Sequence, residues 1–247
     1  MSKLLMFQIA SGAFMFGGVL MKKRVFYTEL SYVLGLIIMA FGAAFTEKAD
    51  FGMSMVVAPP YILHLKVSQF LPWFTFGVAE YFFQGLLVVA TILVMRKFKL
   101  SYLLSFVTAV LYGTLLDFAM NLIAPLPESE FFVRVIWYLL GTICCSIAVS
   151  LFFHTYLSPE AYELIVKEIA SKYGFDINKV KTAYDCFSTL LGVVMSFAFF
   201  GFGVFEGVKL GTVLCAVING FLIGCFSRFF ESRFLFKNRW ELEKYFK

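Results

Sequence analysis

Seven apolar stretches, each long enough to cross a lipid bilayer as a helix, dominate this chain of 247 residues. The hydrocarbon core of a membrane is about 30 Å thick, and a helix needs about 20 apolar residues to cross it. None of the stretches has the period-two alternation of a membrane β-barrel. The sequence therefore predicts an all-α, polytopic membrane helix bundle with seven spans. The predicted spans are residues 4–21, 27–46, 72–95, 101–124, 132–153, 182–205 and 210–230.

The composition excludes a water-soluble globule. Apolar residues make up 61% of the chain and charged residues only 15%, whereas soluble domains are about half apolar and about a quarter charged. With 33 Phe, 10 Met and only 6 Pro, the chain is too apolar to be intrinsically disordered. Its five cysteines lie inside apolar stretches, which argues against a disulfide scaffold.

Lys and Arg predict the orientation, because cytoplasmic loops retain them. With the N-terminus outside and the C-terminus inside, 16 of the 21 basic residues fall in cytoplasmic connections and the tail. The net charge of +5 then reports topology and contact with anionic lipid, not nucleic acid. The first segment has a rival interpretation as a cleaved signal sequence. Its basic residues follow the apolar stretch instead of preceding it, which favours a retained span.

The chain also has an internal repeat, which divides it into four parts: an additional span at 1–26, two three-helix units at 27–124 and 132–230, and a basic cytoplasmic tail at 231–247. Each unit has a span, a long connection with a short helical segment, a second span with an acid near its start, a short link and a third span. The links FKLSYLLSFV and VKLGTVLCAV end alike. Three spans are an odd number, so the units are predicted to be inverted relative to each other, as in many secondary transporters.

Three segments of the chain resemble the YczE/YyaS/YitT family of bacterial integral membrane proteins. They are GLIIMAFGAAFTEKADFGMS at 35–54, VLYGTLLDFAM at 110–120 and FEGVKLGTVLCAVINGFLIGCF at 205–226. The resemblance covers about 27–230 and leaves the first span as an addition. It departs at Lys209, where an arginine is expected, and at Glu80, where an amide is expected. The resemblance implies a protein of the cytoplasmic membrane and does not assign an activity.

Two acids within the predicted spans are the leading candidates for substrate or ion binding, since a charge inside a bilayer is costly unless it faces water or a partner. Asp117 is predicted about 24 Å from the inner edge and Glu80 about 10 Å from the outer edge, at 1.5 Å per residue. The two carboxylates therefore share one depth and are candidates for a proton-binding or cation-binding pair. The alternative is that each acid separately caps or bonds a neighbouring helix.

Further polar residues extend this candidate site. The amides of Gln84, Asn121 and Asn219 either line a path or bond between helices, with packing the favoured role. Asp185 and Arg228 both fall near the inner edge and are predicted to form an ion pair that closes the cytoplasmic side. The alternatives are a favourable acid in a first helical turn for Asp185 and a snorkelling side chain for Arg228.

The two long connections have helical segments too short to span. Residues 51–67 are apolar and broken by Pro59 and Pro60, which indicates a re-entrant or interfacial segment. Residues 158–175 begin with Ser158 and Pro159, which suit a helix start. Ala161, Leu164, Ile165 and Ile169 then share one face, and this helix is expected on the membrane surface or on the bundle.

The sequence contains no phosphate loop, dinucleotide fingerprint, recognisable nucleophile or paired metal-ligand spacing. We therefore predict no catalytic residues, no metal and no cofactor. Two functions stay open: a carrier of a small molecule or ion working by alternating access, and a non-transporting accessory or substrate-binding subunit of a larger complex. The sequence leaves the substrate and any homo-oligomer open.

Overall fold

A computed structural model describes residues 13–16, 19–127, 130–157, 160–175 and 177–239. Six helices are long and apolar enough to cross a membrane, and they indicate a multi-pass membrane protein. They are α2 (Thr28–Ala49), α4 (Phe76–Met95), α5 (Leu100–Ile123), α6 (Phe131–Phe152), α8 (Ile177–Phe200) and α9 (Leu210–Arg233). Two shorter helices are α3 (Ala58–Val67) and α7 (Ala161–Tyr173).

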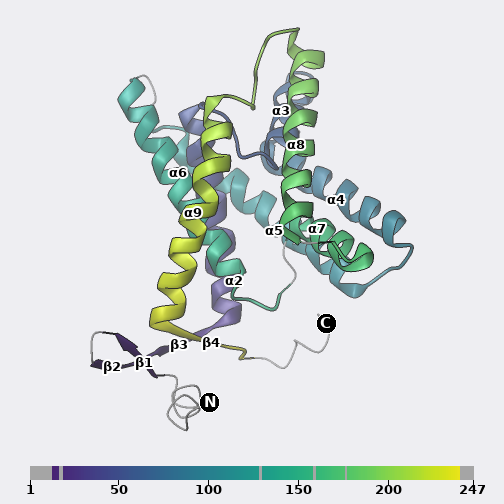
Figure 1. The fold of residues 1–247 in the computed structure, drawn as a ribbon. Coiled ribbons are helices and arrows are strands. Elements are labelled where there is room, and N and C mark those ends of the chain that lie inside the picture. Colours follow the sequence, from purple (N-terminus) through teal and green to yellow (C-terminus); the bar gives the residue numbers. More distant parts are fainter. Residues whose placement is uncertain (1–12, 17–18, 128–129, 158–159, 176, 240–247) are drawn as a thin grey trace.

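The seventh predicted span, at 4–21, is not found in the described part of the chain. Its residues 1–12 and 17–18 lie outside the described residues. Strands β1 (Ala13–Phe16) and β2 (Val19–Lys22) instead pair antiparallel. The prediction that the N-terminus lies outside depended on that span. Strands β3 (Arg24–Tyr27) and β4 (Phe234–Lys237) pair in parallel, so the chain enters α2 and leaves α9 at the same end of the bundle (Figure 1).

The other six spans lie close to their predicted positions, with one shift. The span predicted at 182–205 is helix Ile177–Phe200. Gly201 and Gly203, with φ of +107° and +87°, follow its last turn. A positive φ is incompatible with a continuing right-handed helix, so the helix ends although the apolar stretch continues.

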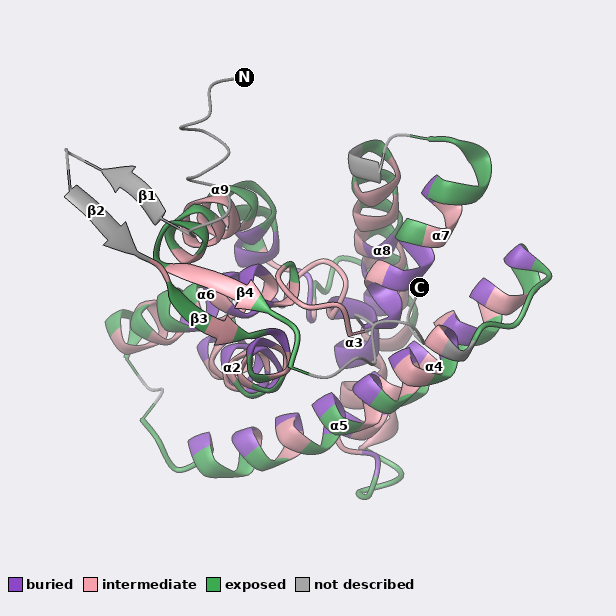
Figure 2. Cartoon of the chain, turned by 90° about the horizontal axis from the view of Figure 1, so that it is seen from below, coloured by how far each residue is buried: buried purple, intermediate pink, exposed green. Residues whose placement is uncertain are grey.

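Helices α2 and α6 form the centre of the bundle and pack along each other. Helix α5 packs against α2 and α4, and α9 packs against α6. Viewed along the bundle in Figure 2, α2 turns buried residues toward its neighbours, whereas α8 and α9 are the least buried of the six spans. Helices α4 and α5 pack closely together, but α8 and α9 have little contact with each other.

The two short helices occupy opposite ends of the bundle (Figure 1). Helix α3 packs against α8 and α4, and α7 packs against α4 and α8. We call the end with the 50–57 and 201–209 connections the Asp50 end, and the end with the 96–99 connection the Glu168 end. Lys66 Nζ donates to Phe199 O, so α3 points its C-terminus toward the Asp50 end. Lys172 Nζ donates to Val94 O, so α7 points its C-terminus toward the Glu168 end.

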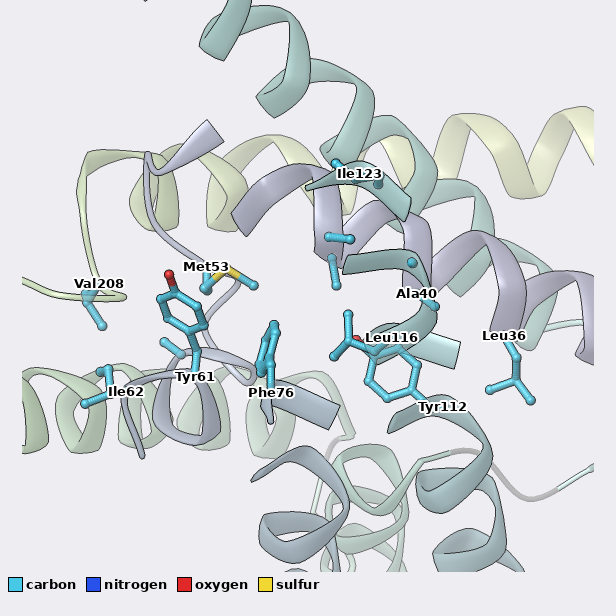
Figure 3. Packing of buried hydrophobic residues seen from close by; sticks show 14 residues of the cluster. Leu36, Ala40, Met53, Tyr61, Ile62, Phe76, Tyr112, Leu116, Ile123 and Val208 are labelled. Atoms are coloured by element: carbon cyan, nitrogen blue, oxygen red, sulfur yellow. The ribbon is translucent and has the colours of Figure 1, made fainter. Parts of the chain in front are cut away.

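The largest hydrophobic cluster joins α2, α3, α4 and α5. Tyr61 of α3 and Phe76 of α4 stack edge to face, with ring centroids 5.1 Å apart, and both turn toward Met53 (Figure 3). Tyr112 and Leu116 of α5 complete the cluster and are almost fully buried. This packing fixes the start of α4 relative to α3 and α5.

Two glycines allow α4 and α5 to cross with their backbones in contact. A Cβ added at Gly77 would overlap the carbonyl oxygen of Gly113, and a Cβ added at Gly113 would lie 2.5 Å from the carbonyl oxygen of Gly77. Lipid supplies no hydrophobic driving force between membrane helices. Their association depends on close van der Waals packing, which small residues at a crossing allow.

We expect Gly77→Ala and Gly113→Ala each to lower the stability of the detergent-solubilised protein by about 1–3 kcal/mol, because the helices must separate. The apparent melting temperature measures this loss. Gly220→Ala is the matched control, since no atom lies within 4 Å of a Cβ added at Gly220 in α9. A control variant as unstable as the other two would contradict the close crossing.

Candidate functional site

The start of α7 lies against the middle of α4 and forms a buried polar cluster there. We call it the Glu80 cluster; its side chains are Glu80, Gln84, Glu160 and Tyr162. Glu80 Oε2 accepts a hydrogen bond from the Tyr162 hydroxyl at 2.8 Å and another from Gln84 Nε2 at 3.3 Å. Gln84 Oε1 in turn accepts from the backbone N–H of Ala161 at 3.2 Å. Glu80 and Gln84 are both completely buried. One amide thus joins the first residue of α7 to the carboxylate on α4.

Two carboxyl oxygens in this cluster have no hydrogen-bond partner among the described residues. They are Glu80 Oε1 and Glu160 Oε1. Glu160 directly precedes α7 and is only 7% exposed. A buried polar atom without a partner costs free energy, so such atoms in a native structure need an explanation.

Acids outnumber bases around the start of α7. Asp185 of α8 forms an ion pair of 2.9 Å with Lys181, one turn away on the same helix. The charge of that lysine also acts on Glu160 and Glu163. Burial, together with the negative charges of Glu163 and Glu80, raises the pKa of Glu160 well above its ordinary value. Burial likewise raises the pKa of Glu163, against the charge of Lys181.

Asp117 does not share the Glu80 cluster and instead caps the start of α4. Its Oδ1 accepts from the Gly77 N–H at 2.8 Å, and its Oδ2 accepts from the Thr75 hydroxyl at 2.5 Å. Thr75 is the N-cap residue of α4, and its hydroxyl accepts from the Val78 N–H. These bonds correspond to the second role considered for Asp117, that of an acid bonded to a neighbouring helix.

The remaining candidate residues lie apart from one another. Asn121 is exposed, while Asn219 Oδ1 accepts from the Ser146 hydroxyl at 2.7 Å and joins α9 to α6. Arg228 donates to the carbonyl of Gly224 on its own helix, whereas Asp185 pairs with Lys181. The described residues therefore contain no ion pair between Asp185 and Arg228 in this conformation.

The backbone at the start of α3 is also buried, but its hydrogen-bonding groups are satisfied differently. The first turn contains Pro59 and Pro60, which have no N–H to satisfy. The Ser188 hydroxyl, midway along α8, donates to the carbonyl of Met55 at 2.9 Å. The chain before α3 therefore extends into the bundle as far as the middle of α8.

At the Asp50 end, a carboxylate joins three helices. Asp50, which ends α2, lies 2.5 Å from Lys209 Nζ and 3.0 Å from an Arg134 guanidinium nitrogen. Lys209 is the N-cap residue of α9, and Arg134 lies in the first turn of α6. The connections also contact through backbone, since the Met53 N–H donates to Gly207 O and the Gly211 N–H donates to Phe51 O, each at 2.8 Å.

A comparable ion pair lies at the Glu168 end. Lys99, the N-cap residue of α5, lies 2.7 Å from Glu168 of α7, and the Tyr102 hydroxyl donates to the same carboxylate at 2.7 Å. Burial works to raise the pKa of Glu168, but the bonds from Lys99 and Tyr102 outweigh it and lower the pKa. Lys99 and Lys209 occupy matching positions in the two similar sequence links, FKLSYLLSFV and VKLGTVLCAV.

The matches to known proteins come from a family model that covers most of this bundle. The model is described as a family of unknown function, DUF6198, and it matches residues 26–228. The chain belongs to this family. The matched residues of the DUF6198 chain run from β3 to the last turns of α9 and leave out 1–25. The resemblance to the YczE/YyaS/YitT family stays a prediction, because the match does not name it.

No curated protein and no solved structure matches the DUF6198 chain. Within the described residues, no group of three or more His, Cys, Asp or Glu side chains is arranged to hold a metal ion. The side chains that form the cluster carry carboxyl, amide and phenol groups.

Sequence reasoning identified Glu80 and Gln84 but missed Glu160 and Tyr162. The missing signal was long-range: Tyr162 and Glu80 are 82 positions apart, and the segment that holds Glu160 is polar enough to resemble a surface helix. The sequence did contain one indication of the cluster. Glu80 and Gln84 are one helical turn apart, so their side chains lie on the same face of a helix.

We expect Asp117→Ala to lower the stability of the DUF6198 protein by about 1–2 kcal/mol, because the start of α4 loses an acceptor. Asp117→Asn should cost less, since an amide oxygen still accepts from Gly77. Thermal unfolding in detergent measures both. Asn121→Ala, one turn farther along α5, is exposed and should leave stability unchanged. If the asparagine variant were as damaging as the alanine variant, the capping role would be wrong.

Proposed function

We propose that the protein is a carrier of a small molecule or ion across the cytoplasmic membrane, working by alternating access between two inverted three-helix halves. The observation that carries this proposal is that each short helix packs on both halves. Helix α3 belongs to the first half and packs on α8 of the second as well as on α4 of its own, and α7 belongs to the second half and packs on α4 of the first as well as on α8 of its own. Inverted halves commonly place a transport site where such broken helices meet.

The lengths of the short helices support a re-entrant placement. At 1.5 Å per residue, 10 residues in α3 and 13 in α7 give about 15 Å and about 20 Å, less than the bilayer core. The contacts with Ser188 and Gln84 place the chain at their starts beside the middle of a full-length helix. Irregular backbone at that depth is tolerated where it is buried in protein or lines a cavity.

The orientation follows from the basic residues. The Glu168 end holds Arg96, Lys97 and Lys99 in the α4–α5 connection, so we assign this end to the cytoplasm. The cargo contacts in this proposal are Glu80 and Gln84 of α4, which lie beside the start of α7. Asp117 and Asn219 hold helices in place beside that region, as their hydrogen bonds to α4 and α6 indicate.

The two lysine ion pairs take the place of the predicted gate between Asp185 and Arg228. Lys209 with Asp50 closes the Asp50 end, and Lys99 with Glu168 closes the Glu168 end. Each pair joins a helix start in one half to a carboxylate in the other half. Opening toward one side would break the pair at that end and keep the other.

Cysteine accessibility tests alternating access without knowledge of the cargo. In a background with the five native cysteines replaced, Ser188→Cys reports on the middle of α8. Reconstituted vesicles of each orientation are treated with a charged, membrane-impermeant thiol reagent. We expect Ser188→Cys to react from both faces, each at a slow rate. Gln69→Cys and Ser171→Cys, exposed at opposite ends, serve as controls that react from one face each.

Neutralising one lysine should shift this accessibility in a defined direction. An ion pair of this exposure is worth about 0.5–1 kcal/mol, so Lys209→Gln should raise labelling from the Asp50 end about two- to fivefold. Lys99→Gln should raise labelling from the other end. Lys209→Arg keeps the charge and should leave the rates unchanged. Absence of labelling from both faces in every variant would overturn the carrier and favour a static accessory subunit.

A further inference from the structure

The Glu80 cluster contains two carboxyl groups, each with one buried oxygen that has no hydrogen-bond partner among the described residues. Glu80 is completely buried and Glu160 is 7% exposed. Each has one oxygen, Oε1, that accepts no hydrogen bond from the described residues. The second oxygen of Glu80 already accepts two hydrogen bonds, from Tyr162 and Gln84. The two acids are connected through Gln84, which bonds Glu80 and also the N–H of Ala161, the residue next to Glu160.

The surrounding charges do not neutralise these acids. Glu163 and Asp185 lie in the same region. Among the described residues, the base whose charge acts on Glu160 and Glu163 is Lys181, which is already paired with Asp185. A buried charge without a partner costs several kcal/mol, and such a group becomes neutral instead.

We propose that Glu80 and Glu160 form a proton-binding pair that holds a proton at neutral pH and releases it only when the start of α7 becomes accessible to water. The proton comes from water and binds a carboxylate oxygen, which makes a neutral carboxylic acid and consumes one negative charge. No metal ion is required. Asp117 does not take part, because its two oxygens hold the start of α4.

The groups that face this pair come from several elements. On α7 they are Tyr162 and Glu163, and on α8 they are Lys181, Tyr184 and Asp185. Tyr112 of α5, Tyr32 of α2 and Cys145 of α6 lie within electrostatic range of Glu160. Tyrosine and cysteine side chains are either neutral or negatively charged, so they cannot supply a positive charge to the pair.

The direction of the pH effect follows from the raised pKa of Glu160. The folded protein holds a proton that the unfolded chain would release above about pH 4.3. Stability is therefore greatest below that pH and is lost as the pH rises toward the folded pKa. This behaviour is independent of transport, so it tests the pair even if the carrier proposal fails.

The experiment compares apparent melting temperatures of the full-length protein in detergent between pH 5 and pH 8. We expect the wild-type protein to lose at least about 5 °C over this range. Glu160→Gln, which mimics the protonated acid, should flatten the dependence and melt above the wild type at pH 8. Parallel curves for the wild type and Glu160→Gln would overturn the proposal.

Glu168→Gln is the matched control, because the same substitution on α7 should have the opposite sign. The pKa of Glu168 is lowered by its partners, so its contribution is present above about pH 4.3 and is lost as the pH falls. This variant should melt below the wild type at pH 8. A generic effect of removing a carboxylate would move both variants in the same direction.

Infrared difference spectra provide a second measurement that does not depend on unfolding. The wild type should show the carbonyl stretch of a protonated carboxylic acid that titrates above the ordinary range of a glutamic acid. Glu80→Gln and Glu160→Gln should each change this titration, because each acid acts on the other. The double variant should lack the signal. A double variant that titrates like the wild type would also overturn the pair.

Discussion

Satisfying the backbone at the start of a buried helix is the constraint on which this architecture depends. The first N–H groups of a helix have no intrahelical partner, and inside a membrane protein water does not supply one. The chain solves this problem in three ways. Pro59 and Pro60 remove donors at the start of α3, Gln84 accepts from the start of α7, and Asp117 with Thr75 accepts from the start of α4. The side chains that satisfy these donors also determine which helices meet.

The same side chains connect structure to chemistry. Gln84 both holds the first residue of α7 and bonds Glu80, so a displacement of α7 changes the surroundings of a buried acid. In the proposed cycle, movement of a short helix and uptake of a proton are therefore coupled through one amide. A carrier needs such a coupling, because binding can favour one conformation only through a difference in affinity between the two.

Sequence reasoning predicted much of the fold and less of the site. Run length located six helices, and the prolines at 59 and 60 indicated a broken segment, because these signals are local. The end of α8 was displaced because glycine conformation at 201 and 203, not hydropathy, ends the helix. Glu160 and Tyr162 were missed because their burial depends on α4, far away in sequence. Asp117 and Glu80 were predicted to share one depth, but depth alone could not show that they have different partners.

The carboxylates of the two lysine ion pairs differ in how far they are shielded from solvent. At the Asp50 end the carboxylate is 54% exposed, whereas at the other end Glu168 is 14% exposed. Dissolved ions screen exposed charges much more than shielded ones. Dissolved salt would therefore act more strongly on Asp50 than on Glu168, so in the proposed carrier the salinity of the medium would shift the resting balance between the two ends.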